Sequence, residues 1–365
     1  MDCSDISDNI PGMLMKWFKS NSKIKRVQPD LYLSTREMKN AAYVGPKNWS
    51  DLQYLDPLRS TYIIIHGYRS SGKKPWVQDL KDKILEWANL NVIIVDWEKD
   101  SNSWNYVNAA FGTQTVGLEV YKLLLDIRSQ IEMRHATQEV QFWSSLYFVG
   151  HSLGAHISAR ISNLLREDYF WRIKRITGLD PAKPCFQNVD FSFKLDHTDA
   201  EFVDIIHTQA GNHRRFNLGL REDLGHMDFY VNGGVVQPAC IKTGRILEEE
   251  ICSHKLARSY FIESIAGSLS KRCEFMSFNW NGSHTHAMEN FDLMRMNGSC
   301  QDCPRMGIDA PAHYYPGRYM VFTGAETPYC KIEDKDVNKL QAALQEGVKE
   351  ISPKRYSDLV EETMG

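Results

Sequence analysis

The sequence predicts an α/β fold built on a mainly parallel central sheet. Short runs rich in β-branched residues alternate with longer segments of helical periodicity, which is the pattern of strands joined by crossover helices. One of these runs leads into a tight turn with a serine at its apex and then into a helical pattern. The strand, the turn and the helix together indicate where a functional site lies.

The expected strands are short and almost wholly apolar, as strands covered on both faces are. They lie at residues 61–65, 91–96, 146–149, 173–179 and 202–207. A long helix is expected at 105–127. We assign residues 1–330 to one catalytic domain. Residues 331–365 form a charged helical tail with one apolar face, and no C-terminal β-sandwich domain is expected after them.

The overall composition is that of an ordinary globular protein, with 42% hydrophobic and 24% charged residues. The formal net charge is −3, so we expect no nucleic-acid partner. No apolar run is long enough to span a bilayer, and therefore no transmembrane segment is expected. No cofactor and no metal ion are predicted.

The eight cysteines are unevenly distributed, because six of them lie between Cys240 and Cys330. Such clustering indicates local disulfide bonds and an oxidising compartment. Cys300 and Cys303 also have the spacing of two zinc ligands, but no second close pair accompanies them. Three N-glycosylation sequons agree with secretion and begin at Asn48, Asn281 and Asn297. Since no signal peptide is recognisable, we expect a secreted protein whose signal is not in this sequence.

The most informative segment is the turn Gly150-His151-Ser152-Leu153-Gly154. A turn this sharp has no room for side chains two residues before and two residues after the serine, and both positions are glycine. The Ser152 oxygen is then raised out of the sheet, and the N–H of Leu153 can hold a developing negative charge. An ordinary exposed serine in a glycine-rich turn is the alternative.

A serine alcohol needs a base to remove its proton and an acid to orient that base. Asp180 ends the strand that follows the serine's helix, and such sites assemble at the carboxyl ends of parallel strands. A loop-capping role is the alternative for Asp180. Spacing alone leaves the base open, since eight histidines follow Asp180; His254 follows a cysteine that could fix its loop. The N–H of Tyr68 is the candidate second oxyanion donor, beside His66, which we expect to be a buried structural residue.

Five motifs, in this order, resemble the pancreatic lipase family of secreted α/β-hydrolases: GHSLGAH at 150–156, ITGLDPAKPCF at 176–186, VDIIHT at 203–208, GHMDFYVNGG at 225–234 and CSHKLARSY at 252–260. The resemblance implies an α/β-hydrolase fold with a nucleophile elbow and a short lid. It also implies a carboxylic-ester hydrolase with Ser152 as nucleophile, Asp180 as acid and His254 as base. The N–H groups of Tyr68 and Leu153 would form the oxyanion hole. Many α/β-hydrolases carry the acid after a later strand, where this chain has Gln209.

The same resemblance implies that Cys240 and Cys252 close the base of a lid over the site. For the remaining cysteines of the cluster we favour two pairs, Cys273–Cys300 and Cys303–Cys330. Cys185 stands where this family can carry a free thiol, and Cys3 has no assigned partner.

The lid has eleven residues, 241–251, and short-lidded members of the family resemble phospholipases A1, including arthropod enzymes. We expect Ile246 and Leu247 to face lipid and the charged run 248–250 to stay in water or meet a head group. An ordinary surface loop is the alternative. The resemblance therefore implies a phospholipase A1 that releases the acyl chain at the first glycerol position, at a lipid–water interface and without a colipase-type partner.

Two other functions stay open on the sequence. The loop 209–225, with Arg214, Arg215 and Arg221, is longer than in the most typical phospholipases A1, so a triacylglycerol lipase is one alternative. A non-catalytic lipid-binding or storage protein of the same fold is the other, although known proteins of that kind lack the nucleophile.

Overall fold

The computed structural model describes residues 27–134, 145–211, 217–241, 245–297, 303–313 and 315–347. Its centre is a ten-stranded sheet in the order β2-β1-β4-β3-β5-β6-β7-β8-β10-β9. The strands are β1 (Asp30–Ser34), β2 (Ala42–Val44), β3 (Thr61–Ile65), β4 (Asn91–Asp96), β5 (Leu146–His151), β6 (Ile173–Leu179), β7 (Ala200–His207), β8 (Met227–Val231), β9 (Ser277–Asn279) and β10 (Gly317–Val321). Neighbouring strands from β4 to β10 are parallel, while β1, β2 and β9 pair antiparallel. This is the mainly parallel sheet of an α/β-hydrolase fold.

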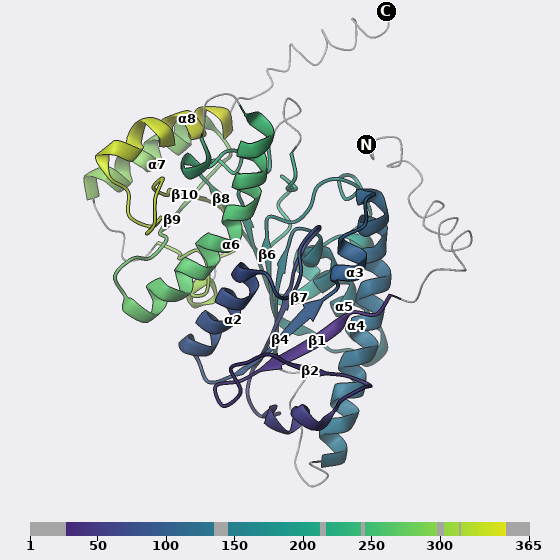
Figure 1. The fold of residues 1–365 in the computed structure, drawn as a ribbon. Coiled ribbons are helices and arrows are strands. Elements are labelled where there is room, and N and C mark those ends of the chain that lie inside the picture. Colours follow the sequence, from purple (N-terminus) through teal and green to yellow (C-terminus); the bar gives the residue numbers. More distant parts are fainter. Residues whose placement is uncertain are drawn as a thin grey trace, which may run out of the picture.

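Helices cover both faces of the sheet (Figure 1). They are α2 (Pro75–Trp87), α3 (Glu98–Ser101), α4 (Tyr106–Arg134), α5 (Leu153–Tyr169), α6 (Ile246–Ser270), α7 (His284–Asn297) and α8 (Val337–Gly347). The helix α4 packs against α5, and α2 packs against α6.

Alternate residues of β3 point to opposite faces of the sheet, as the two-residue period of a strand requires. Ile63 and Ile65 belong to a buried cluster that also contains residues of α4 and α5. Tyr62 and Ile64 belong to a second cluster, with residues of α2 and α6. Because β3 is buried along its whole length, its sequence is apolar throughout rather than alternating.

The strands predicted from β-branched runs are confirmed, and three of them (β3, β4 and β6) have the expected bounds. The strand β5 continues to His151, and β7 begins at Ala200. The helix α4 is longer than expected and ends at Arg134. Its extra turns are stabilised by Ile131, which remains buried in the same cluster as Ile127.

The apolar face predicted for the segment after Cys330 belongs to α8. Leu340 and Leu344 of this helix are buried in a cluster with Trp280, Phe291 and Phe322. The described part of the tail therefore packs onto the sheet domain through a small core of its own.

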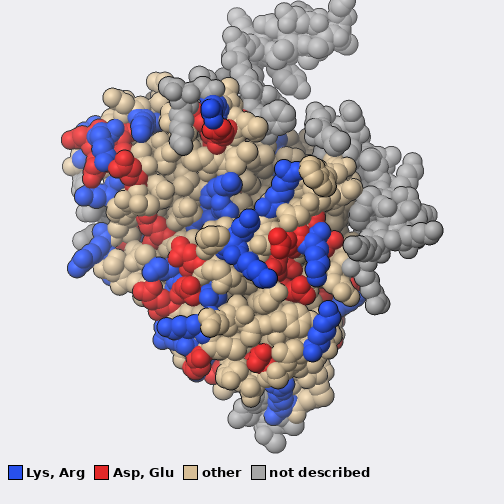
Figure 2. Space-filling view, in the orientation of Figure 1, with Lys and Arg blue, Asp and Glu red and all other residues tan. Residues whose placement is uncertain are grey.

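Charged side chains of both signs are interspersed on the face drawn in Figure 2, in keeping with the small net charge of −3. Among the helices that the structure describes, none has both the length and the apolar character to cross a membrane.

Candidate functional site

Ser152 stands between β5 and α5 in a strained backbone conformation, with φ 57° and ψ −121°. A Cβ on Gly154 would lie 2.2 Å from the carbonyl oxygen of Ile65. A Cβ on Gly150 would lie 2.6 Å from the Cα of Ala155. The steric reason for glycine at both positions, which the sequence suggested, is therefore confirmed. The turn presents Ser152 at the carboxyl edge of the sheet.

Asp180 lies directly after β6 and is fully buried. Its Oδ2 accepts a hydrogen bond of 2.6 Å from Nδ1 of His254. Its Oδ1 accepts from the backbone N–H groups of Thr208, at 2.8 Å, and Gln209, at 3.1 Å. Three donors on one carboxylate fix its orientation toward His254.

The residues after β7 have a defined role in this arrangement. Many α/β-hydrolases place the acid after this strand, whereas here the backbone of Thr208 and Gln209 holds the carboxylate of Asp180. Gly219 permits a close approach from the other side, because a Cβ there would lie 2.6 Å from Oδ1 of Asp180. Any side chain at Gly219 would displace the carboxylate of Asp180.

His254 lies on α6, two residues after Cys252, which is disulfide-bonded to Cys240. Its side chain is 12% exposed, compared with 0% for Asp180. Since its Nδ1 faces Asp180, its Nε2 is left for a reacting group. The sequence alone could not choose this histidine, because it lies 74 residues after Asp180 in the chain and on a separate helix.

Sequence reasoning missed a chain of ring contacts next to His254, tilted between His151 and His254 and edge-on between Trp76 and His151. The ring of His151 lies 4.8 Å from that of His254, the ring of Trp76 lies 5.7 Å from that of His151, and the guanidinium of Arg258 lies 4.8 Å from the ring centre of Trp76. Nε2–H of His151 donates to the backbone carbonyl of His254 at 3.1 Å. Burial, followed by the positive charge of Arg258, lowers the pKa of His151 well below its usual value. The variable position of the serine motif was the available signal for His151.

The two candidate oxyanion donors come from two separate segments of the chain that meet at Ser152. Leu153 is the first residue of α5, and Tyr68 follows Gly67, whose Cβ, if present, would lie 2.8 Å from the Cβ of Ser152. Within the part of the chain described, the backbone hydrogen bonds use neither of these N–H groups. His66 is buried and stacks on Trp97 at 5.5 Å, which confirms its structural role.

The end of the expected lid is part of α6 rather than a separate flap. Ile246 and Leu247 lie in its first turn and are 57% and 58% exposed. The expectation that the whole charged run faces water is wrong, because Glu249 and Glu250 are buried. A helix places successive residues on different sides, so the same turn that exposes Ile246 and Leu247 directs these two carboxylates inward. Residues 242–244 of the lid lie outside the described residues.

The favoured pairing of the later cysteines is wrong, because Cys273 bonds to Cys330. The reason is that the segment containing Cys330, which follows β10, packs on α6. Glu263 of α6 accepts a hydrogen bond of 2.8 Å from the N–H of Cys330, which brings it to the end of α6, where Cys273 follows. Cys303 is also disulfide-bonded, and so is Cys185, which the resemblance allowed as a free thiol.

Four other residues of the sequence analysis lie outside the described residues: Cys3, Arg214, Arg215 and Cys300. Arg221 is described, and burial lowers its pKa.

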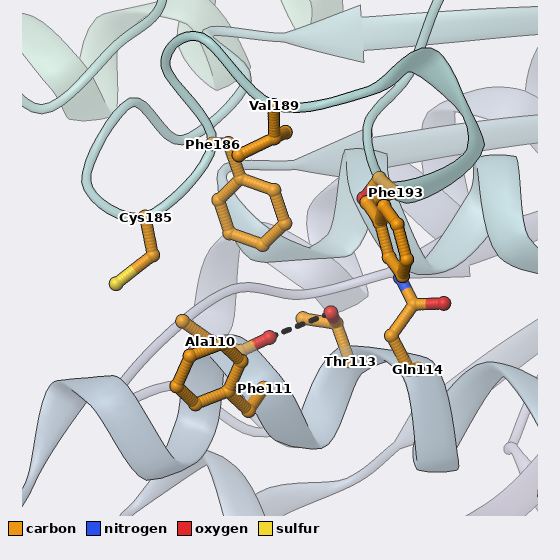
Figure 3. A pocket seen from close by; sticks show the side chains of 8 residues that line it. All are labelled: Ala110, Phe111, Thr113, Gln114, Cys185, Phe186, Val189 and Phe193. Atoms are coloured by element: carbon orange, nitrogen blue, oxygen red, sulfur yellow. Dashed lines mark hydrogen bonds between the residues drawn. The ribbon is translucent and has the colours of Figure 1, made fainter. Parts of the chain in front are cut away.

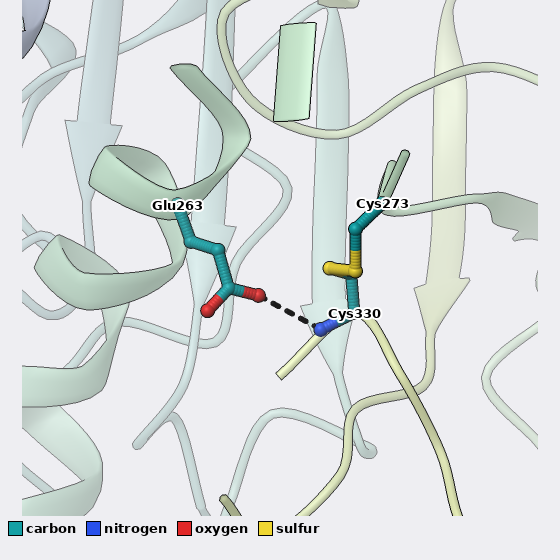
Figure 4. Close-up of side chains that lie close together, drawn as sticks. All are labelled: Glu263, Cys273 and Cys330. Atoms are coloured by element: carbon teal, nitrogen blue, oxygen red, sulfur yellow. Dashed lines mark hydrogen bonds between the residues drawn. A yellow bond between two sulfur atoms is a disulfide. The ribbon is translucent and has the colours of Figure 1, made fainter. Parts of the chain in front are cut away.

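One cluster of potential metal ligands, Glu263 with Cys273 and Cys330, lies near the end of α6 (Figure 4). Both sulfurs are consumed in the disulfide, and one carboxylate oxygen accepts the N–H of Cys330. A metal ion in such a site requires thiolates. The cluster is therefore a structural cross-link.

A small cavity lies between α4 and the loop that follows β6 (Figure 3). Apolar side chains line most of it, among them Phe111, Phe186, Val189 and Phe193. Its volume is about 10 Å³, which is room for about one water. It is too small for an acyl chain, and none of the candidate catalytic residues lines it.

Comparison with known proteins adds to this geometry. A model of the lipase family matches residues 5–329. Lipase member H-A of Xenopus laevis is 36% identical over 320 residues, which cover 82% of this chain and 63% of that protein. Pancreatic lipase-related protein 2 of Mus musculus is 30% identical over 293 residues, covering 74% of this chain and 55% of that protein. The chain thus matches less than two thirds of the length of these relatives.

Solved structures include Est1E from Butyrivibrio proteoclasticus with bound ferulic acid. It aligns with 87% of this chain and 93% of its own, at 12% identity and a TM-score of 0.27. The assignment depends instead on the family match, which spans most of the chain, from residue 5 to residue 329. The protein belongs to the lipase family.

Proposed function

We propose that the protein hydrolyses lipid esters through an acyl-enzyme formed on Ser152, with His254 as base and Asp180 as acid. The observation that carries this proposal is the 2.6 Å hydrogen bond between Asp180 and His254. It lies at the same sheet edge as the strained turn that presents Ser152. A buried acid, a partly exposed histidine and an elbow serine are the three parts that acyl transfer requires.

The proposed reaction follows from the tautomer of His254. Because Asp180 accepts the Nδ1–H, the unprotonated Nε2 takes the proton of Ser152 as its oxygen attacks the ester carbonyl. The N–H groups of Tyr68 and Leu153 stabilise the oxygen that becomes negative. His254 then gives the proton to the departing alcohol. A water attacks the acyl-enzyme while His254 takes its proton, and His254 returns that proton to the Ser152 oxygen as the fatty acid leaves.

For the substrate we propose a phospholipid, cleaved at the first glycerol position. Three basic side chains near the candidate site support this choice. Lys255 and Arg258 lie on α6 close to His254, and Lys74 directly precedes α2. Burial and the charges of Arg258 and Lys74 lower the pKa of Lys255. Burial lowers the pKa of Arg258 to about 10. Cations held this close together are suited to a phosphate head group, which a triacylglycerol lacks.

Secretion is part of the proposal. Two disulfides of the described chain, Cys240–Cys252 and Cys273–Cys330, suit an oxidising compartment. The substrate is then met at a lipid–water interface outside the cell.

The test is a lipid panel with the purified protein, in which fatty acid release from each glycerol position of phosphatidylcholine and from long-chain triglyceride is scored separately. We expect faster release from the first position of phosphatidylcholine. Ser152→Ala should lower kcat by about a million-fold, as for other serine triads. Preferred cleavage of triglyceride would replace the phospholipase by a neutral-lipid lipase. Equal turnover by Ser152→Ala would refute the mechanism. Absence of any ester hydrolysis by the unmodified protein would leave a lipid-binding protein.

A further inference from the structure

Trp104 has the most exposed large hydrophobic side chain of the described chain, at 96%. It lies in the bend between α3 and α4. An exposed indole leaves a large apolar area in water, and tryptophan is used where such an area meets a partner.

The bend that carries Trp104 is held firmly on both sides. The hydroxyl of Tyr68 donates to the carbonyl of Ser103 at 2.8 Å, and the N–H of Arg69 donates to the carbonyl of Ser101 at 3.0 Å. The ring of Tyr106 packs edge-on against that of Tyr68 at 5.1 Å. The backbone is therefore fixed while the indole itself is left outside.

Trp104 lies at the same edge of the sheet as the candidate nucleophile. The helix α4 follows β4, so its beginning lies at the carboxyl edge of the parallel sheet, the edge that also carries Ser152. Figure 1 draws the beginnings of α4 and α6 toward the same end of the molecule. The exposed side chains of Ile246 and Leu247 belong to the beginning of α6.

Basic side chains accompany these apolar groups. Three exposed basic residues lie in the loop after β3, at this same edge of the sheet: Arg69, Lys73 and Lys74. A rim that combines an exposed tryptophan, exposed aliphatic side chains and cations matches the boundary of a phospholipid layer, where indole rings prefer the head-group level.

We propose that Trp104 is an insertion point through which the protein docks on a phospholipid surface, with its carboxyl edge facing the lipid. The identity of this surface rests on the proposed function, but the docking does not require turnover. Binding can therefore be measured in the Ser152→Ala background, where lipid products do not accumulate.

The experiment measures partitioning of Ser152→Ala onto phosphatidylcholine vesicles and compares it with Ser152→Ala/Trp104→Ala. We expect the second variant to bind at least about tenfold more weakly, because inserting one indole removes enough apolar area from water for such a factor. Trp104→Phe should keep part of the binding. Quenching of fluorescence by brominated lipid should be smaller in Ser152→Ala/Trp104→Phe than in Ser152→Ala.

Phe170→Ala is the matched control, because Phe170 is 89% exposed but lies between α5 and β6, at the opposite edge. It should leave vesicle binding unchanged. Trp104→Ala alone should hydrolyse a soluble short-chain ester at the normal rate. Unchanged vesicle binding by the Trp104 variant would overturn the proposal, and so would an equal loss with Phe170→Ala. The proposal would also be overturned if the Trp104 variant changed only in self-association, as measured by sedimentation. If lipid hydrolysis is absent but binding depends on Trp104, the proposed function fails and the docking surface stands.

Discussion

His151 and His254 are joined by a hydrogen bond of 3.1 Å from the imidazole of the first to the backbone carbonyl of the second. This bond ties the residue before the candidate nucleophile to the helix that carries the candidate base. It requires His151 to keep a proton on Nε2. The low pKa of His151 keeps its ring neutral beside the candidate base, which would become positive in the proposed reaction.

The first prediction concerns this bond. His151→Leu should lower kcat by about tenfold to a hundredfold with little change in KM, because the base would be less well positioned. His151→Gln can donate from its amide and should recover part of the loss. Steady-state kinetics on a soluble ester, with circular dichroism as a check on folding, would measure both. Equal kinetics of His151→Leu and the wild type would show that the bond does not position His254.

The second prediction concerns Asp180. Asp180→Asn should lower kcat by about ten-thousand-fold, because an amide can donate to Nδ1 and thus favour the wrong tautomer of His254. The change should leave the fold intact, since Oδ1 of the new side chain can still accept from Thr208 and Gln209. Kinetics and thermal unfolding would be compared on the same preparation. A loss of less than tenfold would mean that Asp180 is not the acid.

The sequence was sufficient for the parts of the fold that local chemistry determines. The run 61–65 predicted β3 because every residue of a strand covered on both faces is apolar. The strand β8 was missed, since Asp228 interrupts its apolar pattern; the Asp228 carboxylate is buried against His207 at 2.9 Å, a partner that only the fold reveals.

The candidate site shows the same division. Ser152 and Asp180 could be located from a strand and the turn after it, because backbone geometry limits which residues fit there. His254 needed a family resemblance, since nothing local relates α6 to β6. The pairing of Cys273 could not be deduced, because spacing alone does not fix disulfide connectivity. The bond to Cys330 depends on the contact of Glu263 with that segment.

The third prediction is a loss of stability in mild acid caused by His156. This ring is buried, bonds to the Ala182 carbonyl at 2.8 Å and accepts from the Leu195 N–H, and burial lowers its pKa to about 3. The unfolded chain binds a proton near pH 6.5 that the folded chain refuses, so stability falls as the pH drops below that value. At pH 5 the cost is about 2 kcal/mol. His156→Gln should lose less stability between pH 7 and pH 5 than the wild type, as measured by urea unfolding. An identical loss in both proteins would contradict this account.

The fourth prediction compares the two described disulfides. Cys240–Cys252 spans 12 positions and Cys273–Cys330 spans 57. Chain entropy predicts stabilisation of about 3 kcal/mol for the first and about 4 kcal/mol for the second. Serine pairs at Cys240 and Cys252 should change the activity on lipid aggregates more than on a soluble ester, because the bond anchors the start of α6. Serine pairs at Cys273 and Cys330 should lower the melting temperature further while changing both activities equally. If loss of Cys273–Cys330, and not of Cys240–Cys252, selectively changed activity on lipid aggregates, the first bond would have no role in lipid contact.

The fifth prediction concerns the exposed first turn of α6. Burying Ile246 and Leu247 in lipid gains at most about 3–5 kcal/mol. The double variant Ile246→Asp/Leu247→Asp should therefore weaken hydrolysis of aggregated phosphatidylcholine far more than hydrolysis of a soluble short-chain ester. Leu269→Asp is the matched control, since Leu269 is 42% exposed near the other end of the same helix. It should leave the ratio of the two activities unchanged. An equal loss of both activities in the double variant would mean that the turn supports the position of His254, two helical turns further along, and does not touch the lipid.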